Sequence, residues 1–222
     1  MDGEINLERI AALIVEKQPD LVALQEVDRG VRRTDGRNLD EELAELTDME
    51  RVFGKASEWQ GGDYGNAILS REEIEWSQNE VMYLEDDIEE RAAIRAQVTI
   101  GTRELIFFST HFSVQKPDRL GQVDDLVDMV LEHDDSLVVI GLDLNDQPGS
   151  AVYEEILTHL TDPWPEVGEG SALTWPASEP TQQLDYILKS NATTSRLRAI
   201  RSWVPTTLAS DHRTVITDFE FL

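Results

Sequence analysis

Short apolar runs that border carboxylate, amide or imidazole side chains constrain the fold of this sequence more than any other feature. Apolar runs of about four to eight residues are typical of buried strands. Five of them lead into, or follow, polar groups: Gln25-Glu26, Ser109-Thr110-His111, Asp143-Leu144-Asn145, Asp185 and Ser210-Asp211-His212. A strand end holds a side chain more rigidly than a loop does. We therefore expect these polar groups to meet in one cleft.

Segments with helical periodicity separate the predicted strands. Helices are expected at 5–14, where Pro19 stops the chain from continuing as a helix, at 40–46, from Pro117 to Leu131 and at 153–157. The third helix should bury one face, formed by Leu120, Val123, Val127, Val130 and Leu131. Strands are expected at 21–24, 67–69, 81–83, 94–100, 105–108, 137–140, 184–188, 195–200 and 214–221, and a loop at 161–180. No linker or repeat divides the chain, so residues 1–222 should form a single α/β domain with two sheets covered by helices.

The composition limits the chemistry that such a cleft can carry. With no cysteine, the chain has no disulfide, thiolate metal site or thiol nucleophile. A metal would need oxygen or imidazole ligands, which favours hard cations such as Mg²⁺ or Mn²⁺. No apolar run approaches the roughly 18 residues of a membrane span, and the N-terminus lacks a signal-peptide pattern. We therefore expect a soluble, cytoplasmic protein.

The chain is also unusually acidic. Its 45 acidic and 19 basic residues give a formal net charge of −26. Such an excess is typical of proteins adapted to molar KCl, where a Debye length of about 3 Å screens the repulsion between surface carboxylates. The same screening lets an anionic substrate approach. We expect a halophilic protein; the alternative is an ordinary acidic one.

The carboxylates and histidines at the strand ends indicate a reaction type. Mg²⁺ is typically held by one or two carboxylates and keeps waters for substrate phosphate, so Glu26 and Asp211 suffice for one ion. A histidine paired with a carboxylate, such as His212 with Asp185, is oriented for proton transfer or charge stabilisation. An aspartate and an amide two residues apart can orient water and stabilise an oxyanion. Together these groups predict metal-assisted hydrolysis of a phosphate ester.

Six short motifs carry a resemblance to a known family. They are Gln25-Glu26-Val27, Gly65-Asn66-Ala67-Ile68-Leu69-Ser70, Ser109-Thr110-His111-Phe112, Gly141-Leu142-Asp143-Leu144-Asn145, Leu184-Asp185-Tyr186-Ile187 and Ser210-Asp211-His212. In this order they resemble the endonuclease/exonuclease/phosphatase superfamily, the DNase I-like phosphoesterases. The resemblance implies a four-layer α/β/β/α sandwich.

The resemblance also implies a role for each polar group. Glu26 is expected to bind the metal, and Asp211 to lie near it. Asp143 and Asn145 are expected to act on water and the transition state, and Asp185 to pair with His212. Thr110-His111 is similar to the DNase I, sphingomyelinase and deadenylase branch, in which this histidine can act as a general acid, and it disfavours abasic-site repair.

Two departures from the family pattern stand out. Leu142 is inserted between the usual glycine and aspartate, which leaves the Asp143 and Asn145 spacing intact. The family's first strand, which carries an asparagine, has no counterpart before the first predicted helix. We expect the true start to lie upstream of Met1, or a neighbouring strand to close the gap.

Four arginines follow Glu26 within nine residues: Arg29, Arg32, Arg33 and Arg37. They form either a phosphate-binding rim, because arginine matches phosphate geometry, or ion pairs with the abundant carboxylates. Asn66, Arg32 and Arg33 are the predicted substrate-binding residues.

The sequence therefore predicts a Mg²⁺- or Mn²⁺-dependent phosphoesterase with a preference for phosphodiesters, nucleic acid being one candidate substrate. One alternative is a phosphomonoesterase acting on a lipid or inositol phosphate, and another is a non-catalytic phosphate-binding module. The oligomeric state is left open.

Overall fold

One half of the molecule is a three-stranded antiparallel sheet covered by two helices. In the computed structural model, which describes residues 5–84, 89–193 and 195–222, the sheet has the order β1-β3-β2. Its strands are β1 (Leu21–Arg29), β2 (Glu50–Trp59) and β3 (Gly62–Ser70), and its helices are α1 (Leu7–Lys17) and α2 (Leu39–Thr47). Buried side chains of both helices, such as Ile14 and Leu43, pack against those of the sheet, such as Val27 and Leu69.

The other half contains a six-stranded sheet with the order β4-β5-β6-β7-β10-β8. This sheet and the sheet β1-β3-β2 are the two main sheets of the fold. The strands are β4 (Ile74–Val81), β5 (Ala92–Ile100), β6 (Arg103–His111), β7 (Leu137–Asp143), β8 (Leu160–Thr161) and β10 (Asp185–Ser190). Only the β6–β7 pairing is parallel. The helices α3 (Lys116–Leu131) and α4 (Ala151–Ile156) cover its outer face.

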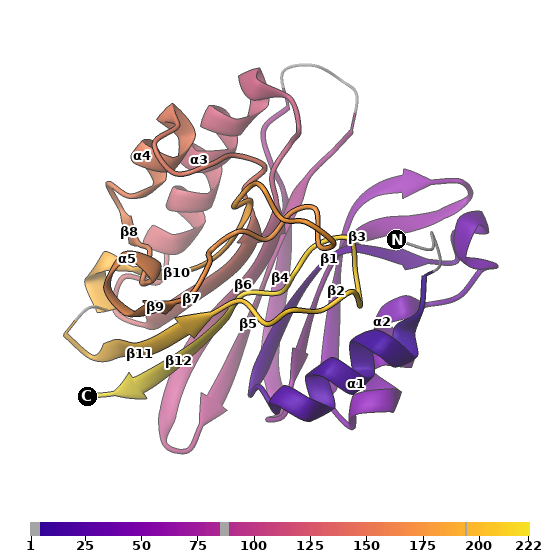
Figure 1. The fold of residues 1–222 in the computed structure, drawn as a ribbon, viewed down its shortest axis with the longest axis horizontal. Coiled ribbons are helices and arrows are strands. Elements are labelled where there is room, and N and C mark those ends of the chain that lie inside the picture. Colours follow the sequence, from indigo (N-terminus) through magenta and orange to yellow (C-terminus); the bar gives the residue numbers. More distant parts are fainter. Residues whose placement is uncertain (1–4, 85–88, 194) are drawn as a thin grey trace.

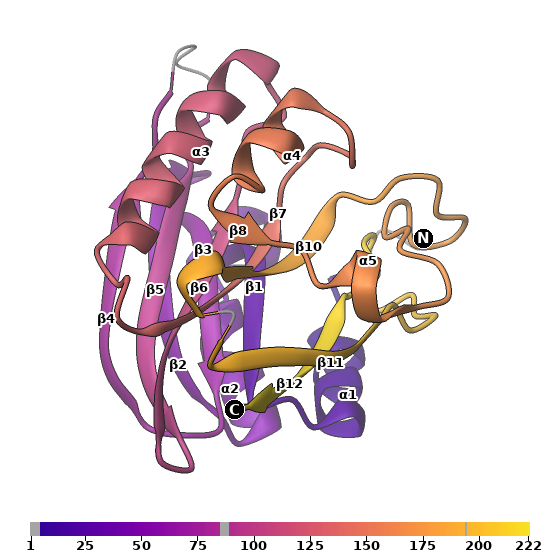
Figure 2. The same ribbon diagram turned by 90° about the vertical axis from the view of Figure 1, so that its left-hand side faces the viewer.

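A third small sheet, with the order β12-β11-β9, extends from the larger one (Figure 2). It consists of β9 (Gly168–Glu169), β11 (Leu197–Trp203) and β12 (Ile216–Phe221). The remaining elements are the short helices η1 (Arg32–Thr34), α5 (Trp164–Val167) and η2 (Asn191–Thr193). Leu197, Phe219 and Phe221 join the apolar core between the two main sheets.

Three separate apolar cores define the layers seen in Figure 1. The first lies between the helices α1 and α2 and the sheet β1-β3-β2. The second lies between that sheet and the six-stranded sheet. The third lies between the six-stranded sheet and the helices α3 and α4. This order of helix, sheet, sheet and helix confirms the predicted four-layer α/β/β/α sandwich. Among the described residues, α1 is the first element and β1 pairs on one side only, with β3. No helix in the described part of the chain is long and apolar enough to cross a membrane.

Local sequence explains where the first helix begins and ends. The side chain of Asn6 accepts a hydrogen bond from the backbone N–H of Arg9, which caps the helix N-terminus. At the other end, Gln18 adopts a left-handed conformation and its N–H bonds to the carbonyl of Ile14. Pro19 follows and prevents continuation. The chain is thereby directed into β1.

Several predicted boundaries were wrong. The strand expected at 81–83 lies earlier, as β4, and the loop expected at 161–180 contains β9 and α5. Leu120 and Leu131 are exposed, because the buried stripe of α3 runs through Val123, Leu126 and Val130 and leaves both leucines to one side of it. The predicted first strand is also longer than the run Leu21–Leu24, because it continues through an irregularity to Arg29.

Candidate active site

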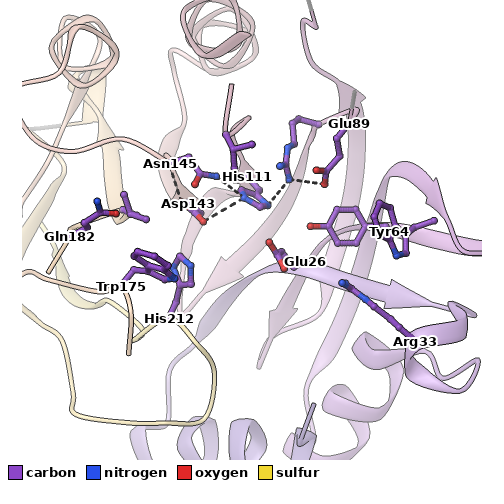
Figure 3. A pocket seen from close by; sticks show the side chains of 14 residues that line it. Glu26, Arg33, Tyr64, Glu89, His111, Asp143, Asn145, Trp175, Gln182 and His212 are labelled. Atoms are coloured by element: carbon purple, nitrogen blue, oxygen red, sulfur yellow. Dashed lines mark hydrogen bonds and ion pairs between the residues drawn. The ribbon is translucent and has the colours of Figure 1, made fainter. Parts of the chain in front are cut away.

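A pocket of about 440 Å³ opens where strands of both main sheets end. Figure 3 shows the side chains around it. Six residues predicted from the sequence line it, namely Glu26, Arg33, His111, Asp143, Asn145 and His212. Strand register explains part of this convergence, because His111 of β6 and Asp185 of β10 both pair with Asp143 of β7. These three polar residues therefore form a row across the adjacent strands β6, β7 and β10, at the ends of the strands.

Glu26 enters the pocket through a distortion of β1. The pairing of β1 with β3 shifts register between Leu24 and Val27, and Glu26 has a backbone φ of 58°. A left-handed conformation is costly for a residue other than glycine, and a bulge re-aims the side chain at the point where it occurs. The distortion thus turns Glu26 out of the regular strand alternation at the position where the pocket lies.

The surroundings of Glu26 fit a divalent cation. Burial between the pocket walls raises the pKa of Glu26, and the negative charge of Asp211 raises it further. Among the described residues, no hydrogen bond or ion pair satisfies this carboxylate. Two neighbouring carboxylates, both open to solvent and that of Glu26 without a hydrogen-bond partner among the described residues, form an oxygen donor set of the kind that Mg²⁺ and Mn²⁺ prefer.

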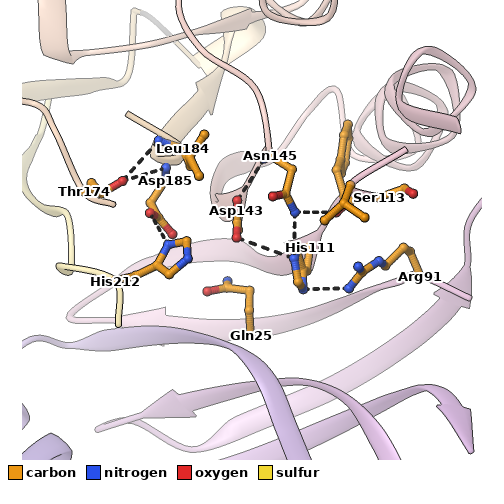
Figure 4. A network of polar contacts seen from close by, with 12 residues as sticks. Gln25, Arg91, His111, Ser113, Asp143, Asn145, Thr174, Leu184, Asp185 and His212 are labelled. Carbon is orange, nitrogen blue, oxygen red and sulfur yellow. Dashed lines mark hydrogen bonds and ion pairs between the residues drawn. The ribbon is translucent and has the colours of Figure 1, made fainter. Parts of the chain in front are cut away.

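His212 and Asp185 form the predicted pair. Nδ1 of His212 lies 2.8 Å from Oδ2 of Asp185 (Figure 4). Burial alone would lower the pKa of His212, but the hydrogen bond and charge of Asp185, with the charges of Asp143 and Asp211, raise it to about 9. His212 is therefore a cation at neutral pH. Asp185 is itself positioned by its backbone N–H, 3.4 Å from the hydroxyl of Thr174.

Asp143 lies between the two histidines. Burial and the charge of Asp185 raise its pKa to about 7, against the opposing effect of His212. Its Oδ1 accepts a 2.9 Å hydrogen bond from the backbone N–H of Asn145, which itself has a φ of 52°. Ligand atoms of Asp143, Asp185 and His212 also lie within 4.8 Å of one another, a second arrangement that could hold a metal ion.

His111 is held in a different way. It is only 4% exposed, and its Nδ1 lies 2.8 Å from the guanidinium Nη1 of Arg91. Because a guanidinium only donates hydrogen bonds, Nδ1 must accept, and the ring proton lies on Nε2. Nε2 lies 2.9 Å from the side-chain amide nitrogen of Asn145, which donates to the carbonyl of Phe112 and cannot accept, and 3.5 Å from Oδ2 of Asp143, the acceptor that its proton can reach. Burial and the charge of Arg91 lower the pKa of His111 well below its ordinary value.

The other predicted residues lie around or outside the pocket. Asp211 is exposed beside it, close enough for its charge to act on Glu26. Asn66 is buried on β3 and donates to the carbonyl of Ala92 at 2.7 Å. Arg32 is exposed and does not line the pocket.

The arginine cluster forms mainly internal ion pairs. Arg29 pairs with Asp40, and Arg37 pairs with Glu42. Arg33 donates from Nε and Nη2 to the buried carboxylate of Asp28, at 2.7 and 2.9 Å. Of the four arginines, only Arg33 also lines the pocket. The intramolecular alternative therefore describes most of the cluster.

Sequence reasoning missed Arg91, which is 3% exposed and directly precedes β5. Its guanidinium also lies 3.3 Å from Glu89, another pocket residue. One signal was available, because a basic residue stands directly before the apolar run that starts at Ala92, as polar residues do at the other strand ends. Trp59 and Tyr64 were missed as well, and their positions at the β2–β3 hairpin gave no such signal.

Comparisons with known proteins agree with this architecture. A sequence profile of the Endonuclease/Exonuclease/phosphatase family matches residues 3–212. A comparison with curated proteins gives no match. Among solved structures, the chain is similar to an endonuclease/exonuclease/phosphatase family protein from Leptotrichia buccalis, with 21% identity, a TM-score of 0.80 and coverage of 97% of this chain and 92% of that one.

Two further structures carry more specific names. The mannosyl-6-phosphatase Bt3783 of Bacteroides thetaiotaomicron has 14% identity and a TM-score of 0.81, with coverage of 97% of this chain and 90% of that one. The human Nocturnin catalytic domain, with a bound sulfate anion, has 19% identity and a TM-score of 0.74, with coverage of 97% and 86%. At such low identity these likenesses establish the fold and leave the substrate open.

Proposed function

Because the chain belongs to the endonuclease/exonuclease/phosphatase family, we propose that it is a metal-dependent hydrolase of phosphate esters that prefers phosphodiesters. The observation that carries this proposal is the meeting of Glu26, Asp143 and His212 in one pocket, each with a raised pKa. Titratable groups that are shifted together in a cleft are typical of catalytic sites. With a pKa of about 9, His212 holds its proton at neutral pH, whereas Asp143, with a pKa of about 7, is there partly ionised and able to accept one.

We assign the metal to Glu26, with Asp211 beside it, and expect Mg²⁺ or Mn²⁺. A cation there would offset the repulsion that raises the pKa of Glu26. The alternative position among Asp143, Asp185 and His212 is less favourable, because a raised pKa keeps His212 protonated at neutral pH and an imidazolium has no free lone pair for a metal. When bound, the cation supplies Lewis-acid polarisation of a phosphoryl oxygen.

Side chains of the protein carry out the proton transfer and stabilise the charge that develops in the reaction. Asp143, with a pKa of about 7, accepts a proton from the attacking water, and Asn145 helps to orient that water. The imidazolium of His212 donates a hydrogen bond to a phosphoryl oxygen and stabilises its growing charge. His111 contributes a neutral Nε2–H donor on the opposite side of Asp143. This proposal differs from the general-acid role that the resemblance implies, because a lowered pKa leaves His111 as a neutral imidazole, whose one N–H proton donates a hydrogen bond and is not released at neutral pH.

A phosphomonoesterase is the second candidate. The structural likeness to a mannosyl-6-phosphatase supports it, since that protein's name describes a sugar monoester. The same pocket groups serve both reactions, so the leaving group has to be tested directly. A non-catalytic phosphate-binding module is a weaker alternative, because simple anion binding does not require carboxylates of raised pKa inside the pocket.

The test is hydrolysis of bis-p-nitrophenyl phosphate and p-nitrophenyl phosphate in molar KCl, with Mg²⁺, with Mn²⁺ or with a chelator. We expect the diester to be cleaved faster than the monoester, and the chelator to abolish both activities. Glu26→Gln should weaken metal binding, measured by calorimetry, and remove most of the activity. A faster reaction with the monoester would favour the phosphomonoesterase.

Glu104→Gln is the matched control, because Glu104 is an exposed carboxylate at the opposite end of β6 from His111. It should retain wild-type metal affinity and turnover. Unchanged metal affinity in Glu26→Gln as well would contradict the assignment of the metal, and no hydrolysis of either ester by the wild-type protein would contradict the proposed function.

A further inference from the structure

Two exposed tryptophans border the pocket. The chain has five tryptophans, all within the described residues, and only Trp59 and Trp175 are classed as exposed, at 42% and 37%. Both line the pocket. Two large aromatic faces that are open to solvent at the same pocket can stack on a flat ligand bound there. Their location suggests that this ligand is the substrate.

On one side of the pocket, Trp59 belongs to a rigid aromatic shelf. It is the last residue of β2 and pairs with Gly62 across a tight hairpin turn, in which Gln60 and Gly61 both have positive φ. Its ring centroid lies 6.5 Å from that of Tyr64, which is buried beside it. The Arg33 guanidinium lies 5.6 Å from the Tyr64 ring centroid.

On the other side, Trp175 is fixed by the backbone of a long loop. Its N–H donates to the carbonyl of Gln182 at 3.0 Å, and its carbonyl accepts from the N–H of Thr181 and of Gln182. The Trp175 ring centroid lies 6.5 Å from that of His212. This loop therefore presents an aromatic face next to His212.

The two aromatic faces lie on opposite sides of the reacting groups. Figure 3 shows Tyr64 and Trp175 on either side of Glu26, with His111 and Asp143 between them. A phosphodiester bound at these central groups would extend one substituent toward Trp59 and the other toward Trp175. Flat aromatic faces bind nucleobases without regard to sequence, because every base has a π-face.

We propose that the substrate is single-stranded nucleic acid or a dinucleotide, with the base on one side of the scissile phosphate stacked on Trp59 and the base on the other side stacked on Trp175. This inference rests on the proposed function. In the reaction, the water oxygen bonds to phosphorus and one P–O ester bond breaks. The leaving sugar oxygen keeps the electron pair of that bond and takes a proton from solvent water to become an alcohol, while Asp143 accepts one proton from the attacking water. The other nucleoside retains a phosphate monoester.

Other phosphate esters fit these walls less well. An inositol polyphosphate would need several free cations, whereas Arg33 and Arg91, the two pocket arginines, are paired with Asp28 and Glu89. A lipid would need a continuous apolar surface rather than two separate rings. Duplex DNA keeps its bases paired and stacked inside the helix, so they cannot reach the tryptophans.

The test compares Trp59→Leu and Trp175→Leu with the wild-type protein on thymidylyl-(3′→5′)-thymidine, under the salt and metal conditions that support cleavage of bis-p-nitrophenyl phosphate. Each substitution should raise KM for the dinucleotide about 5- to 100-fold, with a smaller change in kcat. Trp59→Phe and Trp175→Phe keep an aromatic face and should restore most of the affinity. Inhibition by inorganic phosphate, which has no base, should be unchanged in all four variants.

Trp203→Leu is the control, because Trp203 lies on β11 outside the pocket and stacks under Arg201. A single-stranded oligonucleotide should also be cleaved faster than the same sequence in a duplex. Wild-type cleavage of bis-p-nitrophenyl phosphate together with an unchanged dinucleotide KM in both leucine variants, or no cleavage of the dinucleotide at all, would overturn the stacking proposal and leave the proposed function intact. Failure to cleave either diester would overturn the proposed function first.

Discussion

His111 and His212 line the same pocket, but the Nδ1 atoms of their rings contact groups of opposite charge. Nδ1 of His212 lies against the carboxylate of Asp185, whereas Nδ1 of His111 lies against the guanidinium of Arg91. Both rings are in enclosed positions where burial alone lowers the pKa. The carboxylate reverses that effect for His212 and raises its pKa to about 9, while the arginine strengthens it for His111.

The comparison shows that burial alone does not decide the role of a histidine. The group that contacts Nδ1 decides whether the imidazole ring is a cation that stabilises charge or a neutral hydrogen-bond donor. In this pocket the two kinds stand on either side of Asp143, the expected base. A phosphate bound between them would meet a positive charge on one side and a neutral donor on the other.

The largest expected effect comes from removing the cation. His212→Ala should lower turnover by about a hundredfold or more, since an oriented group of this kind typically contributes 10² to 10⁴. Steady-state kinetics on bis-p-nitrophenyl phosphate measure this. His159→Ala is the control, because His159 is exposed and outside the pocket. If turnover in His212→Ala stays within about threefold of wild type, His212 serves the fold only and the comparison loses its catalytic meaning.

A smaller effect should follow when the partner of His212 loses its charge. Asp185→Asn removes the hydrogen bond to a carboxylate and the charge that do most to raise the pKa of His212, so this pKa should fall from about 9 toward its ordinary value, with burial opposed only by the charges of Asp143 and Asp211. The variant should lose His212 protonation, and with it activity, at a lower pH than wild type. We expect the activity loss to reach about tenfold or more near pH 8 and to be smaller near pH 6.

The same shift predicts a change in stability, measured by urea unfolding of the metal-free protein. A raised folded-state pKa stabilises the wild-type fold fully below about pH 6.5 and no longer does so once the pH has risen through about 9. The difference in free energy of unfolding between wild type and Asp185→Asn should therefore shrink as the pH rises. A constant difference across this range would show that Asp185 acts by packing and not through the charge of His212.

A third test exchanges the partner of His111. Arg91→Met removes the donor that fixes Nδ1 as an acceptor, and we expect turnover to fall about tenfold, in line with roughly 1.5 kcal/mol for a hydrogen bond to a charged group. Arg91→Lys keeps a cationic donor and should recover part of the activity. Nitrogen NMR of the wild-type protein should find His111 unprotonated at Nδ1 and protonated at Nε2. The reverse tautomer would refute the proposed role of Arg91.

The smallest expected effect is that of salt, which should act more strongly on the charges of the surface than on those of the pocket. Raising KCl from about 0.1 M to about 3 M should increase the melting temperature, because screening relieves repulsion among exposed carboxylates in a chain of net charge −26. The pKa of His212 should change much less, because its hydrogen-bonded partner is enclosed with it. A melting temperature that does not vary with KCl would contradict the expectation of a halophilic protein.

Most of the fold was accessible from the sequence because its signals are local. Buried strands such as Leu137–Ile140 are continuous apolar runs, and Pro19 stops the first helix without help from the rest of the chain. The boundaries that failed depended on distant contacts. Nothing near Gln25 and Glu26 shows that β1 continues past them, because the irregularity there is defined by pairing with β3.

The candidate site divides in the same way. The sequence by itself determined which residue types stand next to the apolar runs, and this led to the prediction that Glu26, Asp143 and His212 form a phosphoesterase-like set. Only the tertiary structure decided what each group touches. Arg91 and His111 are separated by 20 residues, and Trp59 and Trp175 reach one pocket from a hairpin of one sheet and a loop beside the other. Such neighbours are set by strand register and sheet packing, which depend on the whole core, and the local sequence does not show which residues will meet.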